Sequence, residues 1–146
     1  MSELEFFDRA WEDNPPETFV DDLPSGVYGF AVKSAPRKVS QTRGGAGYVK
    51  FIFTIPSQPG DMVSHSFFVS KSTGEPNPIG MRKLREFTHR LGFDFATGSD
   101  MLEHAAEMNG VAFQGEYRYN GPDGFAELRV LSVGGAAENE VVDAPF

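Results

Sequence analysis

Cysteine is absent from the 146 residues, which excludes a disulfide and a thiolate metal site. No apolar run approaches the length needed to cross a bilayer, and the first residues are acidic where a secretory signal would be basic. Nucleophile elbows, paired metal-ligating histidines and phosphate-binding glycine fingerprints are missing as well. We therefore expect a cytoplasmic protein that is not an enzyme, with no catalytic residues, no cofactor, no metal and no membrane partner.

Positive charge is scarce overall, since 13 Lys and Arg stand against 21 Asp and Glu. The acids are concentrated at the two ends. Residues 1–22 hold eight acids against Arg9 alone, and residues 134–146 hold three with no base. The body, residues 23–133, holds twelve bases against ten acids. This asymmetry indicates interaction tails and predicts three parts: an acidic N-terminal arm (1–22), a domain (23–133) and an acidic, flexible C-terminal tail (134–146).

Alternating apolar residues in the body predict five strands, over 26–39, 48–55, 62–70, 111–120 and 125–133. Asn77, Pro78 and Gly92 are typical of a helix start and stop between the third and fourth strands, and a shorter helix is predicted over 99–108. The fold class is therefore mainly β. The order of the predicted elements, three strands, a helical segment and two strands, matches a five-stranded OB-fold barrel with a helical insert between strands three and four. A β-sandwich is less compatible, because five strands and two helices would cover it poorly.

Two connecting segments have their own signals. Residues 5–12 predict a short amphipathic helix, and Asn14-Pro15-Pro16 ends it, so that an extended arm follows and lies on the domain or on a second subunit. Gln41 to Gly47 predicts a flexible, glycine-rich connection.

Cationic and aromatic residues that alternation turns outward form a candidate binding surface. Five bases and no acid occur between Lys33 and Lys50. Cations along a groove, with aromatic faces on which bases stack, are what sequence-independent binding of a single strand requires. The candidate nucleic-acid-binding residues are Lys33, Arg37, Lys38, Arg43, Tyr48, Lys50, Phe68, Lys71, Arg118, Phe125 and Arg129.

The chain ends on Asp143-Ala144-Pro145-Phe146, with Glu138 and Glu140 just upstream. A terminal Phe146 after Pro145 combines an apolar ring with a carboxylate, which suits a hydrophobic slot ringed with Arg or Lys on another protein. This ending resembles the acidic tail of single-stranded DNA-binding proteins. With the strand order, the whole chain resembles the phage-type members of that class, which act in replication, recombination and repair.

The resemblance implies several expectations. The body would bind single-stranded DNA, and the tail (Glu138, Glu140, Asp143, Pro145 and Phe146) would recruit replication or recombination proteins and compete with DNA for the groove. A phage-encoded protein would act in the host cytoplasm. Either acidic end is a candidate for self-association as a homodimer. Two alternatives remain: an RNA-binding barrel, which shares every feature named here, and a non-enzymatic interaction adaptor or DNA mimic that binds no nucleic acid.

Overall fold

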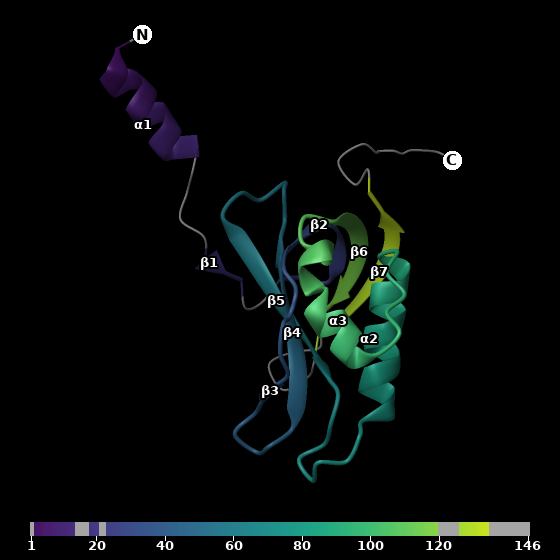
Figure 1. Ribbon diagram of the computed structural model, residues 1–146. Helices are drawn as coiled ribbons and strands as arrows, with labels where there is room; N and C mark the ends of the chain where they lie inside the picture. Colours follow the sequence, from purple (N-terminus) through teal and green to yellow (C-terminus); the bar gives the residue numbers. More distant parts are fainter. Residues whose placement is uncertain (1, 14–17, 21–22, 120–125, 135–146) are drawn as a thin grey trace.

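The computed structural model describes residues 2–13, 18–20, 23–119 and 126–134. Its centre is a mainly β domain in which a seven-stranded mixed sheet is accompanied by helices (Figure 1). The main strands are β2 (Gly26–Ser34), β4 (Gly47–Thr54), β5 (Asp61–Phe68), β6 (Ala112–Arg118) and β7 (Glu127–Val133). The five strands predicted from alternation are thus all present, although the first ends at Ser34 rather than at Val39.

The sheet order is β1-β5-β4-β2-β6-β7, with β3 pairing β4. β2 and β4, β4 and β5, β2 and β6, and β6 and β7 are all antiparallel neighbours. Among the described strands no ladder joins β5 to β7, so the sheet is open and the closed barrel is not confirmed. Two short strands were not predicted: β1 (Thr18–Phe19) and β3 (Ser40–Gln41).

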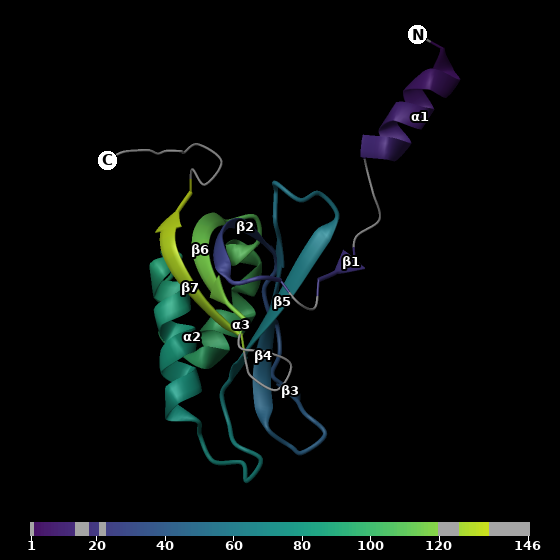
Figure 2. The ribbon, with the colours of Figure 1, turned by 180° about the vertical axis from the view of Figure 1, so that it is seen from behind.

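β1 attaches the N-terminal arm to the sheet in a parallel pairing with the start of β5. Thr18 N–H donates to the Gly60 carbonyl at 2.8 Å, and Val20 N–H donates to the Met62 carbonyl at 2.8 Å. The amphipathic helix predicted before it is present as α1 (Glu3–Asp13). Both ribbon views place α1 away from the sheet (Figure 2).

Helix α2 (Pro78–Arg90) begins and ends where the sequence predicts. The Asn77 side chain accepts a hydrogen bond from Gly80 N–H at 3.0 Å, and Gly92 after the helix has a φ of 99°. The next predicted helix is shorter than expected. α3 (Gly98–Glu103) stops at His104, and a 3-10 turn, η1 (Ala105–Met108), follows it.

The core is built from phenylalanine rings, which accounts for much of the aromatic content. Phe87 of α2 has ring centroids 5.0 Å from Phe51 and 5.2 Å from Phe67, and it also contacts Phe53 and Phe113. All five rings are buried. Since α2 packs against both β5 and β7 (Figure 1), Phe87 fills the interior where the two strands do not pair.

Candidate nucleic-acid interface

The outward face of β4 and β5 carries two of the predicted aromatic residues side by side. Burial alternates along β4, so that Val49 and Phe51 are buried while Tyr48 is half-buried and Lys50 is exposed. In register, Tyr48 faces Phe68 and Lys50 faces Ser66. The Tyr48 and Phe68 ring centroids are 5.9 Å apart at 49°. The prediction that Tyr48, Lys50 and Phe68 point away from the core is confirmed.

The glycine-rich segment before β4 forms a hydrogen-bonded turn, while its flexibility stays a prediction. Gln41 pairs with Gly47, and Thr42 N–H donates to the Ala46 carbonyl at 2.9 Å. Gly45 N–H donates back to the Thr42 carbonyl at 2.9 Å, and Gly45 has a φ of 94°, which favours glycine. The turn carries the exposed Arg43.

This turn packs on the loop that follows β5. Gly47 N–H donates to Ser70 Oγ at 3.0 Å, and Val69 N–H donates to the Gly47 carbonyl at 2.9 Å. Since Gly47 precedes Tyr48 and Val69 follows Phe68, the two loops meet beside the aromatic pair. They bring the predicted cations Arg43 and Lys71, both exposed, to that same end of the sheet.

The segment with Lys33, Arg37 and Lys38 runs along the other edge of β4. Ser34 faces Ile52 and Ser40 faces Tyr48, so the residues between them pass alongside Lys50. A hydrogen bond of 2.9 Å from Ala35 N–H to Asn109 Oδ1 anchors the segment. The three cations are exposed. The fold thus gathers around β4 the acid-free run that the sequence singled out.

The β6–β7 hairpin differs, because its cations face acids. Arg118 is in register with Glu127, and Arg129 is in register with Glu116. Opposite charges directly across a hairpin stabilise each other. Both arginines are exposed, as predicted, and each has an acid in register across the hairpin. Phe125, the remaining predicted aromatic, lies outside the described residues, as does the whole C-terminal tail from residue 135.

A groove of about 660 Å³ lies between β5, α2 and the β6–β7 hairpin. It connects Phe68 and Lys71 with Arg118 and Arg129, four of the predicted residues. The sequence did not indicate two other cations that line it, Lys83 and Arg90, because their position depends on how α2 packs. Three acids, Glu86, Glu116 and Glu127, line the groove too. We call it the mixed-charge groove, because bases and acids both line it, in contrast to the charges around β4.

His65 lies at the inner side of this groove. Its exposed fraction is 9%, and its ring is 4.8 Å from the Phe67 ring. Burial, reinforced by the positive charge of Lys83, lowers the pKa of His65 to about 4, against an opposing effect of Glu127. His65 is therefore a neutral core residue at pH 7.

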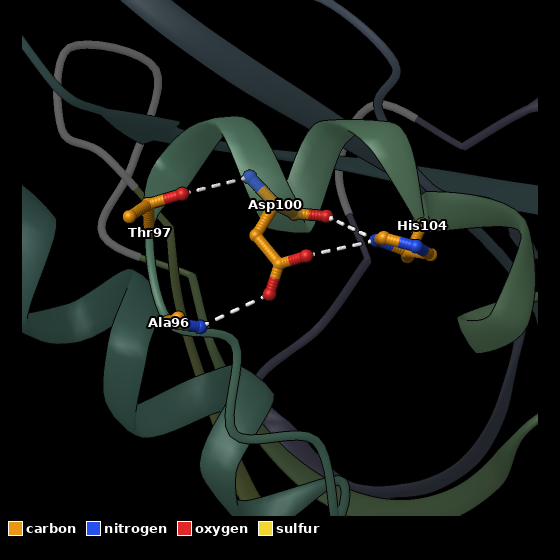
Figure 3. A network of polar contacts seen from close by, with 4 residues as sticks. All are labelled: Ala96, Thr97, Asp100 and His104. Carbon is orange, nitrogen blue, oxygen red and sulfur yellow. Dashed lines mark hydrogen bonds and ion pairs between the residues drawn. The ribbon is translucent and has the colours of Figure 1, made fainter.

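A second polar cluster, at the start of α3, serves to cap that helix. The Asp100 carboxylate accepts from Ala96 N–H at 3.1 Å and lies 2.9 Å from His104 Nδ1, while Asp100 N–H donates to Thr97 Oγ1 at 3.0 Å (Figure 3). A hydrogen bond with the Asp100 backbone, together with the negative charges nearby, raises the pKa of His104. Asp100, Glu103 and His104 have ligand atoms within 4.8 Å of one another. Helical spacing explains this proximity, because Glu103 and His104 lie three and four residues after Asp100.

Compared with known proteins, the chain matches no family model and no curated protein sequence. Within the described residues, no helix is long and apolar enough to cross a membrane.

Proposed function

We propose that the protein binds single-stranded DNA without sequence preference, through an OB-type domain whose barrel is open between β5 and β7. An OB barrel opened between its third and fifth strands has the order seen here for β5, β4, β2, β6 and β7, with the helix after the third strand. In OB folds, nucleic acid lies on the second and third strands and on the loops next to them. The corresponding strands in this protein are β4 and β5.

The observation that carries the proposal is the Tyr48–Phe68 pair with cations on both sides. Two outward aromatic rings 5.9 Å apart provide stacking faces. Lys50 and the run from Lys33 to Arg43 supply positive charge along the same face, with no acid between Lys33 and Lys50. Phosphates would follow the cations while bases stack on the rings, so binding should weaken with salt.

The C-terminal tail extends the proposal to partners. Its acids and terminal Phe146 suit recruitment of replication, recombination or repair proteins. Tethered to the domain, the tail also competes with DNA for cationic surface at a high effective concentration. Removing it should therefore strengthen DNA binding.

Fluorescence anisotropy with labelled oligo-dT of about 30 nucleotides, long enough for more than one OB site, tests the proposal. The full chain and a chain ending at Val133 are titrated at two salt concentrations, with duplex DNA and oligo-U as comparisons. We expect salt-sensitive binding to the single strand that tightens without the tail. Tighter binding of oligo-U would support the RNA alternative.

Substitution of Lys33, Arg37, Lys38 and Lys50 by alanine should abolish binding to oligo-dT. If neither the full chain nor the shortened one binds any nucleic acid, the DNA-binding proposal is wrong and the adaptor alternative replaces it. One structural feature favours that alternative, namely an acidic α1 with large exposed apolar side chains.

A further inference from the structure

Helix α1 presents an apolar stripe to solvent. Leu4, Phe7 and Trp11 are 74%, 58% and 73% exposed and lie three and four residues apart, on one side of the helix. The Phe7 and Trp11 rings contact each other edge to face, with centroids 6.0 Å apart. A surface helix normally buries such a stripe against another element.

The domain carries an apolar groove of its own. It has a volume of about 800 Å³ and lies beside α2, between that helix, the segment that leads into α3, and the ends of β4 and β5. Its apolar lining includes Val69, Met81, Leu84, Phe93, Phe95 and Met101. Leu84 is buried whereas Met81 is 42% exposed, so the Met81 side chain is available at the groove.

Charge is complementary as well. α1 carries five acids against the single Arg9, whereas α2 carries four Lys and Arg against the single Glu86. His89 is bridged to Asp94 and Arg90 to Glu86, so Arg82, Lys83 and Arg85 carry the excess positive charge of α2. Of these three, Arg85 lines the groove, where Glu86 and Asp94 occur too, so most of the positive charge lies on the neighbouring part of α2.

The arm starts far from the groove of its own domain. β1 is paired at Asp61 and Met62, while the groove includes Val69, seven residues further and about 23 Å along β5. The four residues between Asp13 and Thr18 span at most about 18 Å. Both ribbon views place β1 and α2 on opposite sides of the molecule, with β4 and β5 between them (Figures 1 and 2).

We infer that α1 docks in the apolar groove of a second copy of this chain, with Leu4, Phe7 and Trp11 buried beside α2. An amphipathic helix in a hydrophobic groove is a recurrent mode of recognition. Reciprocal docking of two arms gives a closed, two-fold symmetric dimer. Tyr48 and Phe68 do not line the groove, so the proposed DNA-binding pair is separate from the docking site. The inference therefore does not depend on DNA binding.

Sedimentation velocity of the full chain tests this dimer. The arm variant is Trp11→Asp and the groove variant is Met81→Glu, both at exposed positions that leave the core unchanged. Leu131→Asp is the matched control, because Leu131 is 44% exposed on β7, away from both features. Circular dichroism checks that each variant is folded.

At about 50 μM, a concentration that populates micromolar complexes, the wild type and L131D should be dimers. W11D and M81E should dissociate at least tenfold more readily. Mixed together, they retain one intact arm–groove pair, so tagged W11D should capture M81E but not itself. A monomeric wild type, or W11D and M81E dimers as stable as the wild type, would overturn the inference.

Discussion

Gly80 of α2 lies against the backbone carbonyl of Phe68, so closely that a Cβ atom at residue 80 would overlap the carbonyl oxygen. Asn77 N–H donates to the Val69 carbonyl at 2.9 Å beside this contact. The first turn of α2 is thus fixed to the end of β5, next to the Tyr48–Phe68 pair and at the edge of the mixed-charge groove.

Gly80→Ala should push α2 away from β5 and lower the free energy of unfolding by about 1–3 kcal/mol, as overpacking does. Urea denaturation measures this change. Gly98→Ala at the start of α3 is the control, since nothing lies within 4 Å of its Cβ position, and it should be neutral or slightly stabilising. Equal stability of the two variants would contradict the close approach.

The aromatic pair gives a prediction for binding. Tyr48→Ala should weaken the affinity for oligo-dT by about 1–3 kcal/mol, the usual contribution of a ring on which a base stacks. Phe68→Ala should have an effect of similar size. Tyr48→Phe keeps the ring and should bind like the wild type. Anisotropy titrations measure all three, and unchanged binding by both alanine variants would exclude stacking on this face.

The loop cations give a prediction for salt dependence. If Arg37 and Lys38 each contact a phosphate, their double alanine variant should reduce the slope of log K against log salt by about 1.4, or about 0.7 for each contact with a single strand. Arg82→Ala on α2 removes an exposed charge that is not part of the run from Lys33 to Lys50, and it should leave the slope unchanged. An equal effect of both variants would indicate only long-range attraction.

His65 makes stability depend on pH. Its pKa falls from 6.5 to about 4 on folding, chiefly through burial. Below pH 6.5 His65 binds a proton in the unfolded chain but stays neutral in the folded protein. The contribution of His65 to the free energy of unfolding is therefore complete above pH 6.5 and is lost as the pH falls towards 4. The expected loss between pH 7.5 and pH 5 is about 2 kcal/mol.

Urea denaturation at the two pH values measures this loss. His65→Gln should remove about 2 kcal/mol of the pH dependence, whereas Ser64→Gln, an exposed neighbour on β5, should keep it. A variant without His65 that loses stability as steeply as the wild type would show that other groups cause the acid sensitivity.

Local patterns predicted the strands and faces well. The alternation Tyr48, Val49, Lys50, Phe51 fixes which side chains β4 buries, because neighbouring residues in a strand point to opposite faces. Asn77 and Pro78 start α2 through local capping bonds that need no tertiary information.

Features that depend on distant contacts were not predictable in the same way. β1 and β3 are two residues long and exist only through pairing with β5 and β4. The first strand ends early because Ala35 N–H bonds with Asn109 instead of continuing a ladder. Lys83 lines the mixed-charge groove only because of how α2 packs. The positions of the acids opposite Arg118 and Arg129 depend on the register of the β6–β7 hairpin.

Trp11 is the only tryptophan of the chain and lies on α1, whereas the proposed stacking pair consists of Tyr48 and Phe68. Its emission therefore reports on the arm alone. Burial in a groove should shift the emission to the blue, while stacking of bases on the sheet should quench tyrosine emission. The unlabelled protein thus carries two separate optical reporters, and the absence of cysteine leaves room for a third at any engineered thiol.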